Sequence, residues 1–253
     1  MRRINPVVAA AVMIAAALVL GTCSAPRNAL RQPDPEIVQS VTTGLVSRQD
    51  PIRVSFTQPV AEGEIGATLH RSPFRFAPRI RGAARWIDDR TLEFAADGDL
   101  PAGRRVRVSV DLPKLAGFDF AFTVIAPSYT VDVGQLETGD GADAYRLAGT
   151  LRTSDREESA KVERILTARL APGAGRSAAL PVAWSHDEDG LGHSFTVTGI
   201  ARAADPGSLE LAWSGTPIAA KTAGHRTVSV PSLGTFEVLG ARVPDGEDRV
   251  IEV

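Results

Sequence analysis

Cys23 is the residue whose type and position in this sequence point most directly to chemistry. It is the only cysteine among 253 residues, so it has no disulfide partner within the chain. It follows an unbroken apolar run over residues 7–20, from which Gly21 and Thr22 separate it. A thiol beside an apolar segment, with no folded context around it, suits covalent lipid attachment better than a packed core. We therefore expect Cys23 to be a lipid attachment site.

The amino terminus as a whole has the features of an export signal. Two arginines follow the initiator methionine, and the apolar run is shorter than the roughly 20 residues that a membrane-spanning helix needs. Leu20 stands three residues before Cys23 with small residues between them, the arrangement at which bacterial lipoproteins are cut and acylated. We expect residues 1–22 to be a lipoprotein signal peptide. Cleavage after Ala25 by the ordinary signal peptidase, and an uncleaved anchor, are the alternatives.

Four histidines could serve as general bases, but none lies in a recognisable catalytic motif. They are His70, His186, His193 and His225. Serines are plentiful, yet no Gly-x-Ser-x-Gly elbow and no glycine-rich phosphate loop surrounds any candidate. Residues 185–193 combine two histidines with aspartates and glycines, which is typical of a solvated hairpin loop, with a metal or calcium site as the alternative. We expect no catalytic residue, no metal site and no cofactor, and thus no enzyme.

Three tryptophans could form a sugar-binding platform, since aromatic faces stack on pyranose rings. Trp86, Trp184 and Trp213 each fall within a strand pattern, however. A buried tryptophan is the commoner role in a β-sandwich. We expect all three to lie in the core.

Composition limits the class of protein. The part after Cys23 has no cysteine for disulfides, so hydrophobic cores must stabilise it. The length suggests about two domains. A net charge of −2 with interspersed arginines and aspartates gives no basic stripe, which argues against a nucleic-acid partner.

The first half of the mature chain has the period-two pattern of short β-strands. Residues 23–35 lack any periodicity and are expected to be a flexible tether. From there, apolar residues alternate over 52–56, 82–94, 106–110 and 118–124, with turn signals between the runs. We expect an immunoglobulin-like β-sandwich over residues 36–126.

The second half repeats this style with one interruption. Strand patterns recur through residues 127–231, which we expect to form a second β-sandwich. Ser154 is followed three residues later by Glu157, and apolar residues then fall at helical spacing, which predicts a capping box and a short helix of two or three turns over 162–170. Residues 232–253 read as the beginning of a third domain whose remainder lies further along a longer protein. The predicted fold is thus mainly β, with tandem immunoglobulin-like sandwiches, the second of which contains a short helix.

The order and spacing of several segments resemble a known family. The chain resembles the amino-terminal region of bacterial α2-macroglobulin-type lipoproteins from about residue 36 onward. The segments that carry this resemblance are Thr43–Thr57, Trp86–Phe94, Thr150–Asp155, Val162–Leu166, Phe195–Ile200 and Trp213–Gly215.

The resemblance implies a large protease trap in the bacterial cell envelope. In that family a protease cuts a bait segment, the domains rearrange around it, and many members capture it through a thioester cysteine. Neither a bait segment nor a thioester motif can be recognised in this sequence. The resemblance therefore implies that the chain supplies the anchor and first scaffold domains of a broad-spectrum endopeptidase inhibitor.

The expected partners and location follow from this interpretation. They are membrane lipid through acylated Cys23, proteases trapped by the full-length protein, and downstream domains, on the periplasmic side of the inner or outer membrane. The alternative is an immunoglobulin-like adhesion or ligand-binding module of an envelope lipoprotein that traps no protease. A periplasmic hydrolase would require a catalytic domain downstream.

Overall fold

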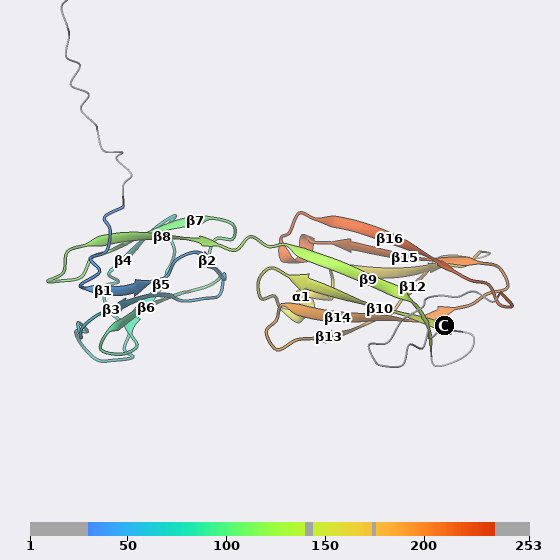
Figure 1. The fold of residues 1–253 in the computed structure, drawn as a ribbon, viewed down its shortest axis with the longest axis horizontal. Coiled ribbons are helices and arrows are strands. Elements are labelled where there is room, and N and C mark those ends of the chain that lie inside the picture. Colours follow the sequence, from blue (N-terminus) through green and yellow to red (C-terminus); the bar gives the residue numbers. More distant parts are fainter. Residues whose placement is uncertain (1–29, 140–143, 174–175, 236–253) are drawn as a thin grey trace, which may run out of the picture. The chain divides into compact units, whose positions relative to one another are not determined.

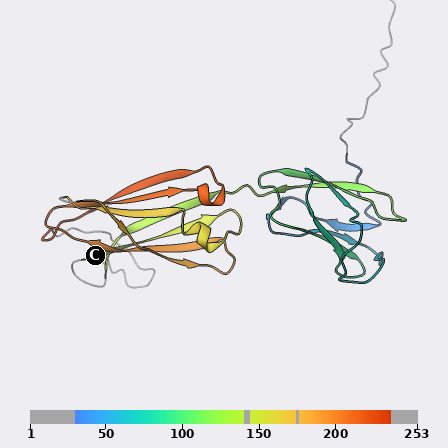
Figure 2. The ribbon, with the colours of Figure 1, turned by 180° about the vertical axis from the view of Figure 1, so that it is seen from behind.

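The computed structural model describes residues 30–139, 144–173 and 176–235, and these form two β-sandwiches in sequence order (Figures 1 and 2). The predictions for the signal peptide, for Cys23 and for the strands expected from Phe236 onward lie outside the described residues. The fold is mainly β and immunoglobulin-like, as the alternating patterns predict.

The first sandwich has two four-stranded sheets. One has the strand order β1-β3-β6-β5 and the other β2-β8-β7-β4, and all pairs are antiparallel except β2 with β8. The strands are β1 (Val38–Val41), β2 (Leu45–Val46), β3 (Ile52–Phe56), β4 (Phe74–Ala77), β5 (Gly82–Trp86), β6 (Thr91–Ala96), β7 (Arg105–Val110) and β8 (Phe118–Val124). Strands β4 and β5 are therefore both edge strands, and they are consecutive in the chain.

Alternation determines which side chains fill the first core. Ile52, Val54 and Phe56 of β3 are fully buried, as the period-two pattern predicts. Phe118, Phe120 and Phe122 of β8 face them from the other sheet and are almost as fully buried. The prediction that Trp86 is a core residue is confirmed, because its ring packs against Phe56 with 5.9 Å between centroids.

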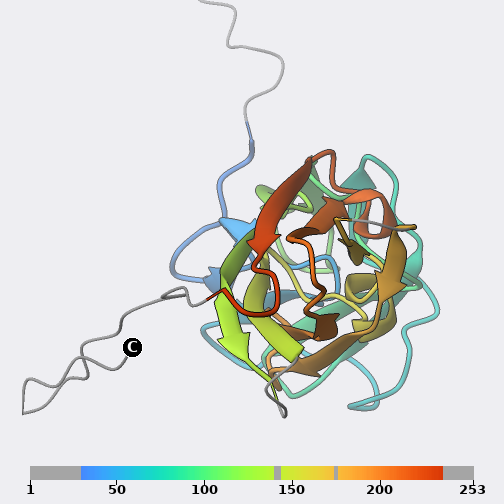
Figure 3. The ribbon, with the colours of Figure 1, turned by 90° about the vertical axis from the view of Figure 1, so that its right-hand side faces the viewer.

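The second sandwich also has two antiparallel four-stranded sheets, β13-β14-β10-β9 and β12-β11-β15-β16, and Figure 3 shows them as two facing layers. Its strands are β9 (Tyr129–Thr138), β10 (Ala144–Thr153), β11 (Leu166–Ala171), β12 (Ala178–Leu180), β13 (Val182–His186), β14 (Gly192–Ala201), β15 (Gly207–Ser214) and β16 (Ala223–Val230). The chain changes sheets at Pro181, since β12 and β13 belong to different sheets. A proline has no N–H for a continuous ladder, which suits it to this crossing.

The helix prediction is correct in existence but wrong in extent. The helix α1 covers only Ser159–Val162, and its N-cap is Glu158. A 3-10 turn, η1, lies much further along the chain at Thr216–Ile218. The residues expected to continue the helix form β11, which pairs with β15 over six residues. Leu166 and Ala168 are buried while Thr167 and Arg169 are exposed, so period two determines the structure here. None of the helices in the described ranges has the length and hydrophobicity that a transmembrane span requires.

Part of the predicted tether contacts the first sandwich. Arg31 donates both main-chain and side-chain hydrogen bonds to Asp119 on β8, at 3.0 to 3.2 Å, and its carbonyl accepts from the Asp119 N–H. These hydrogen bonds lower the pKa of Asp119, although burial partly opposes the shift. Contacts with the first sandwich thus begin at Arg31, five residues before the predicted domain boundary at residue 36.

Candidate binding pocket and interdomain contact

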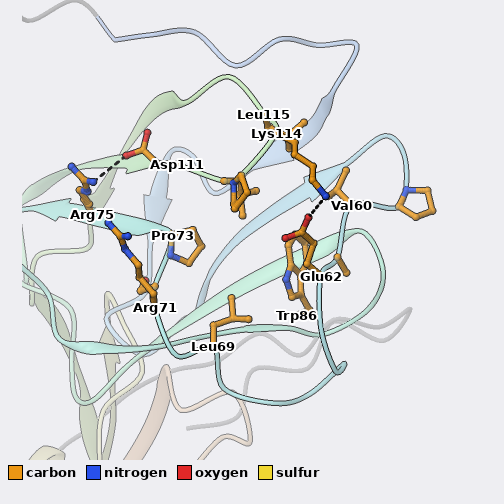
Figure 4. Close-up of a pocket in the computed structure, with 15 residues that line it drawn as sticks. Val60, Glu62, Leu69, Arg71, Pro73, Arg75, Trp86, Asp111, Lys114 and Leu115 are labelled. Carbon is orange, nitrogen blue, oxygen red and sulfur yellow. Dashed lines mark hydrogen bonds and ion pairs between the residues drawn. The ribbon is translucent and has the colours of Figure 1, made fainter.

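The first sandwich contains an open pocket with a cavity volume of about 860 Å³ (Figure 4). Its apolar part is formed by side chains that pack on the core from one side and face the pocket from the other. These include Val60, Leu69, Leu112 and Leu115, with Trp86 at the base. The volume lies within the range of about 300–1,000 Å³ that is usual for ligand pockets.

Three segments of the chain position this lining. The connection between β3 and β4, together with Arg75 of β4, supplies the lining residues between Pro59 and Arg75. Strand β5 supplies Trp86, and the segment after β7 supplies residues 111–115. Main-chain hydrogen bonds from Gly66 to the Trp86 carbonyl and from Leu69 to the Ala84 carbonyl, both 2.8 Å, attach the connection to β5. The pocket wall is therefore held by backbone contacts as well as by side chains.

Charged side chains surround the apolar part. Figure 4 shows Arg71 and Arg75 on one side and the ion pair of Lys114 with Glu62 on the other. Lys114 Nζ lies 3.0 Å from Glu62 Oε1, and Arg75 lies 3.7 Å from Asp111. All four paired side chains are at least 44% exposed, and exposed pairs of this kind contribute only about 0–1 kcal/mol. A charged ligand can therefore compete for these groups at low cost.

The sequence did not lead us to this pocket. Most of its lining comes from loops with no periodic pattern. Among the lining residues the sequence pattern singled out only Trp86, as a core residue. The available signal was the arginine-rich stretch from Arg71 to Arg81, which contains no acidic residue. Such one-sided charge is unusual in a chain whose charges are otherwise interspersed.

A second notable cluster joins the two sandwiches. The Arg48 N–H donates to Asp155 Oδ2 at 2.9 Å, and its guanidinium bonds Glu157 Oε1 at 2.6 Å and contacts Asp155 at 3.4 Å. The three side chains are only 11%, 3% and 3% exposed, so this is a buried interaction. Arg156 adds an ion pair with Asp50 at the edge of the cluster.

The two buried carboxylates respond to this site in opposite ways. Burial pushes the pKa of Asp155 upward, but hydrogen bonds from Arg48, Ser47 and the Arg156 N–H outweigh it, so this pKa is lowered. For Glu157 burial dominates and raises the pKa, with the Arg48 hydrogen bond only partly offsetting it. Glu157 is therefore the more easily protonated of the two.

The predicted capping box is wrong, because both of its residues serve the connection between the sandwiches. Ser154 Oγ accepts from the Ser128 N–H and donates to the Ala126 carbonyl, both at 2.9 Å, and Glu157 binds Arg48. The α1 N-cap, Glu158, makes no side-chain capping hydrogen bond. The Ser-x-x-Glu pattern thus belongs to the contact between the two sandwiches and does not mark the start of a helix.

The histidines divide into two exposed residues and one interacting pair. His70, between β3 and β4, and His225, on β16, are exposed. His186 Nδ1 and His193 Nδ1 lie 2.9 Å apart across the β13–β14 hairpin, and His186 Nε2 lies 3.2 Å from Glu163. The expectation of a solvated loop over 185–193 is wrong for His193, which is 2% exposed, because it lies within β14.

The two Nδ1 atoms can share one hydrogen bond, and His193 is the buried member of the pair. The pKa of His193 is lowered, mainly by burial and secondly by electrostatic repulsion from the nearby His186. No group of three or more potential metal ligands occurs within the described parts of the chain. Trp184 stacks over His186 at 6.2 Å between centroids, and Trp184 and Trp213 are half-buried rather than fully buried.

Comparisons with known proteins identify no family for this chain. No protein-family model matches the chain, and the comparison with curated proteins gives no match. Among solved structures, an L,D-transpeptidase from Mycobacterium tuberculosis H37Rv is 17% identical with a TM-score of 0.28, and the match covers 60% of each chain, less than two thirds of the transpeptidase. Bovine butyrophilin is 10% identical over 79% of this chain and 97% of its own, with a TM-score of 0.30. A chimeric titin Z1Z2 is 11% identical over 77% and 94%, with a TM-score of 0.34.

Proposed function

We propose that this chain is the lipid-anchored, non-catalytic scaffold at the amino end of a bacterial envelope protein of the α2-macroglobulin type. Acylated Cys23 attaches it to the membrane facing the periplasm. The two sandwiches then hold the protease-trapping parts of the full-length protein near the envelope. The trap is a broad-spectrum endopeptidase inhibitor.

The buried contact of Arg48 with Asp155 and Glu157 is the observation that supports a scaffold role most strongly. Immunoglobulin-like domains in tandem are often joined by linkers that leave each domain free to move. Here a charged cluster is buried between the domains, and Ser154 binds the connecting residues 126–128. A domain pair joined in this way can carry a mechanical load from an anchor to the domains that follow.

The test is a trapping assay on the protein isolated from the cell envelope. An antibody against residues 36–231 captures the native protein, which is then incubated with an endopeptidase at equal molarity. A trap leaves cleavage of a small chromogenic peptide intact but blocks cleavage of a large protein substrate. We expect cleavage of the large substrate to be blocked while cleavage of the small one continues. We also expect a captured polypeptide several times larger than this chain.

Two results would contradict the proposal. Equal cleavage of large and small substrates, with and without the captured protein, would exclude trapping. A Cys23→Ala variant that remained in the membrane fraction and a wild type that incorporated no palmitate label would exclude the lipid anchor. Ser24→Ala is the matched control for the second measurement, since it leaves the thiol in place.

The pocket of the first sandwich favours a second candidate function. A concave, partly apolar site is the usual form of a ligand-binding module. If the envelope protein fails the trapping assay, an immunoglobulin-like ligand-binding module is the function that this pocket supports.

A further inference from the structure

The pocket adjoins an edge of the first sandwich with an unusual excess of positive charge. Residues 70–81 contain four arginines and no acidic residue, and all four arginines are exposed: Arg71, Arg75, Arg79 and Arg81. Within the described ranges, the side chains of Arg71, Arg79 and Arg81 have no ion-pair or hydrogen-bond partner. The one ion-pair contact of Arg75 with another described residue is at 3.7 Å, with Asp111. These guanidinium groups are therefore available to an incoming anion.

A second hollow continues the first along the same edge. It has a cavity volume of about 570 Å³ and shares Ser72 and Arg75 with the larger pocket. Its apolar lining includes Phe76 and Ile80, which are half-buried, and Asp97 is its acidic residue. The two hollows thus lie on either side of a shared boundary at the start of β4.

The strand between the hollows has a free hydrogen-bonding position. Among the strands of the described residues, β4 is the last one of its sheet and pairs on one side only, with β7. The Asp111 N–H donates to the Pro73 carbonyl at 3.0 Å. In this register the main-chain N–H and C=O groups of Arg75 and Ala77 point toward β7. The peptide groups of Phe76 consequently point away from β7. The main-chain N–H and C=O of Phe74 also point away from β7, but both are already hydrogen-bonded to Ser72 Oγ.

We propose that this edge, defined as residues 71–81 together with the two hollows, binds an extended acidic segment of a partner protein. Acidic side chains of the segment pair with the arginines, and two of its apolar side chains enter the two hollows. The segment's backbone can add to the free edge at Phe76, as in other cases of strand addition. This activity is separate from protease trapping and does not depend on it.

The observations favour a peptide over an anionic membrane surface. Membrane-surface binding needs apolar side chains that protrude into the bilayer. Here Val60, Leu69 and Leu115 are half-buried and line a hollow instead. Two hollows beside an edge strand match the alternating side chains of an extended chain, which repeat every second residue.

The experiment measures binding of three labelled nonapeptides to the purified full chain by fluorescence anisotropy. The first probe, DFELDLEFD, alternates acidic and apolar residues. The second, DSESDSESD, keeps the charge and removes the apolar side chains, and the third, KFKLKLKFK, reverses the charge. We expect the first probe to bind at least ~10-fold more tightly than either other probe, since burying one large apolar side chain is worth roughly that factor or more. Binding should weaken as salt rises from 0.05 to about 0.5 M.

Two variants locate the site. Arg71→Glu should weaken the first probe at least ~10-fold through charge reversal. Ala61→Phe, which places a ring in the larger hollow without changing charge, should weaken it by a similar factor. Arg104→Glu is the matched control, because Arg104 is exposed just before the opposite end of β7. Circular dichroism melting shows which variants remain folded. If Arg71→Glu does not fold, Arg79→Glu takes its place.

The proposal is overturned if the first and second probes bind equally, because the hollows would then play no part. It is also overturned if Arg104→Glu reduces binding as much as Arg71→Glu, which would indicate unspecific attraction. Vesicles containing 30% anionic lipid serve as a third comparison. Binding to such vesicles without binding to any peptide would identify the edge as a membrane contact instead.

Discussion

At the scale of single residues, Glu93 shows how this protein buries a charge. It lies on β6 directly between Arg53 on β3 and Arg85 on β5 in the strand register. Arg53 Nε donates to it at 2.9 Å and Arg85 donates at 2.7 Å. The Glu93 side chain is only 4% exposed, while each arginine is about half exposed. The arginine stems cover the carboxylate and leave their own heads near water.

We predict that Glu93→Gln lowers the free energy of unfolding by about 1–3 kcal/mol at pH 7, because two charge-assisted hydrogen bonds are weakened in a buried setting. Burial opposes ionisation of Glu93, but the hydrogen bonds from Arg85 and Arg53 outweigh it and lower the pKa. The stabilisation is thus complete above the unfolded-state pKa of about 4.3 and is lost as the pH falls. Urea unfolding at pH 7 and pH 3 measures both effects.

The matched control for Glu93 is Glu62→Gln, which weakens the exposed ion pair with Lys114. It should change stability by less than about 0.5 kcal/mol. If the difference between wild type and Glu93→Gln were the same at pH 3 as at pH 7, the carboxylate could not be the source of the stabilisation.

At the scale of elements, the β13–β14 hairpin contains a pH-sensitive contact. Burial and the nearby His186 lower the pKa of His193. Between the lowered pKa and the ordinary pKa of about 6.5, the unfolded chain therefore binds more protons than the folded chain. Stability therefore falls as the pH falls below about 6.5. Protonation of both rings would also place two N–H groups face to face across the 2.9 Å separation.

We predict that His193→Phe reduces the loss of melting temperature between pH 7.5 and pH 5.0, because it removes the proton-binding group while keeping a ring. The variant should be less stable than wild type at pH 7.5, since the hydrogen bond to His186 is lost. His70→Gln changes an exposed histidine and should keep the wild-type slope. Equal slopes for His193→Phe and wild type would show that His193 does not titrate in this range.

Close packing between neighbouring strands gives another prediction. A Cβ at Gly149 on β10 would clash with the Phe195 ring and lie 2.6 Å from the Asp132 carbonyl oxygen. Because backbone is among the atoms that would have to move, we expect Gly149→Ala to lower the free energy of unfolding by about 1–3 kcal/mol. Gly98→Ala, whose Cβ has nothing within 4 Å, should be close to neutral. Denaturant unfolding of both variants decides this, and equal stabilities would contradict it.

The elements also show what the sequence can and cannot predict. Strong alternation, as in Ile52, Val54 and Phe56, predicted the strands correctly because one face of each must be buried. The helix over 162–170 was overestimated, since Val162, Ile165 and Leu166 satisfy helical spacing and also lead into a strand that β15 completes. Pairing with a distant strand is not encoded in a local window. The pocket was missed for the same reason, because its walls come from three separate segments.

At the scale of the whole molecule, the contact of Arg48 with Asp155 and Glu157 is the feature on which the scaffold role depends most. Residues from both sandwiches contribute to it, and sequence patterns gave no indication that Arg48 would be buried. Because the pKa of Asp155 is lowered and that of Glu157 is raised, their effects on the pH dependence of stability oppose each other. Substitution is therefore a sharper test of this contact than titration.

We predict that Arg48→Met frees the two sandwiches from each other. Methionine keeps most of the apolar stem but leaves two buried carboxylates without their partner, a loss typically of about 3–5 kcal/mol. Proteinase K should then cut the connection at residues 125–128 faster than in wild type, as measured by mass spectrometry of the products. Adding Asp155→Asn and Glu157→Gln to Arg48→Met removes the uncompensated charges and should restore much of the resistance. Arg104→Met controls for the loss of an exposed arginine. If Arg48→Met were cut at the wild-type rate, the contact would not hold the sandwiches together, and the scaffold proposal would lose its main structural support.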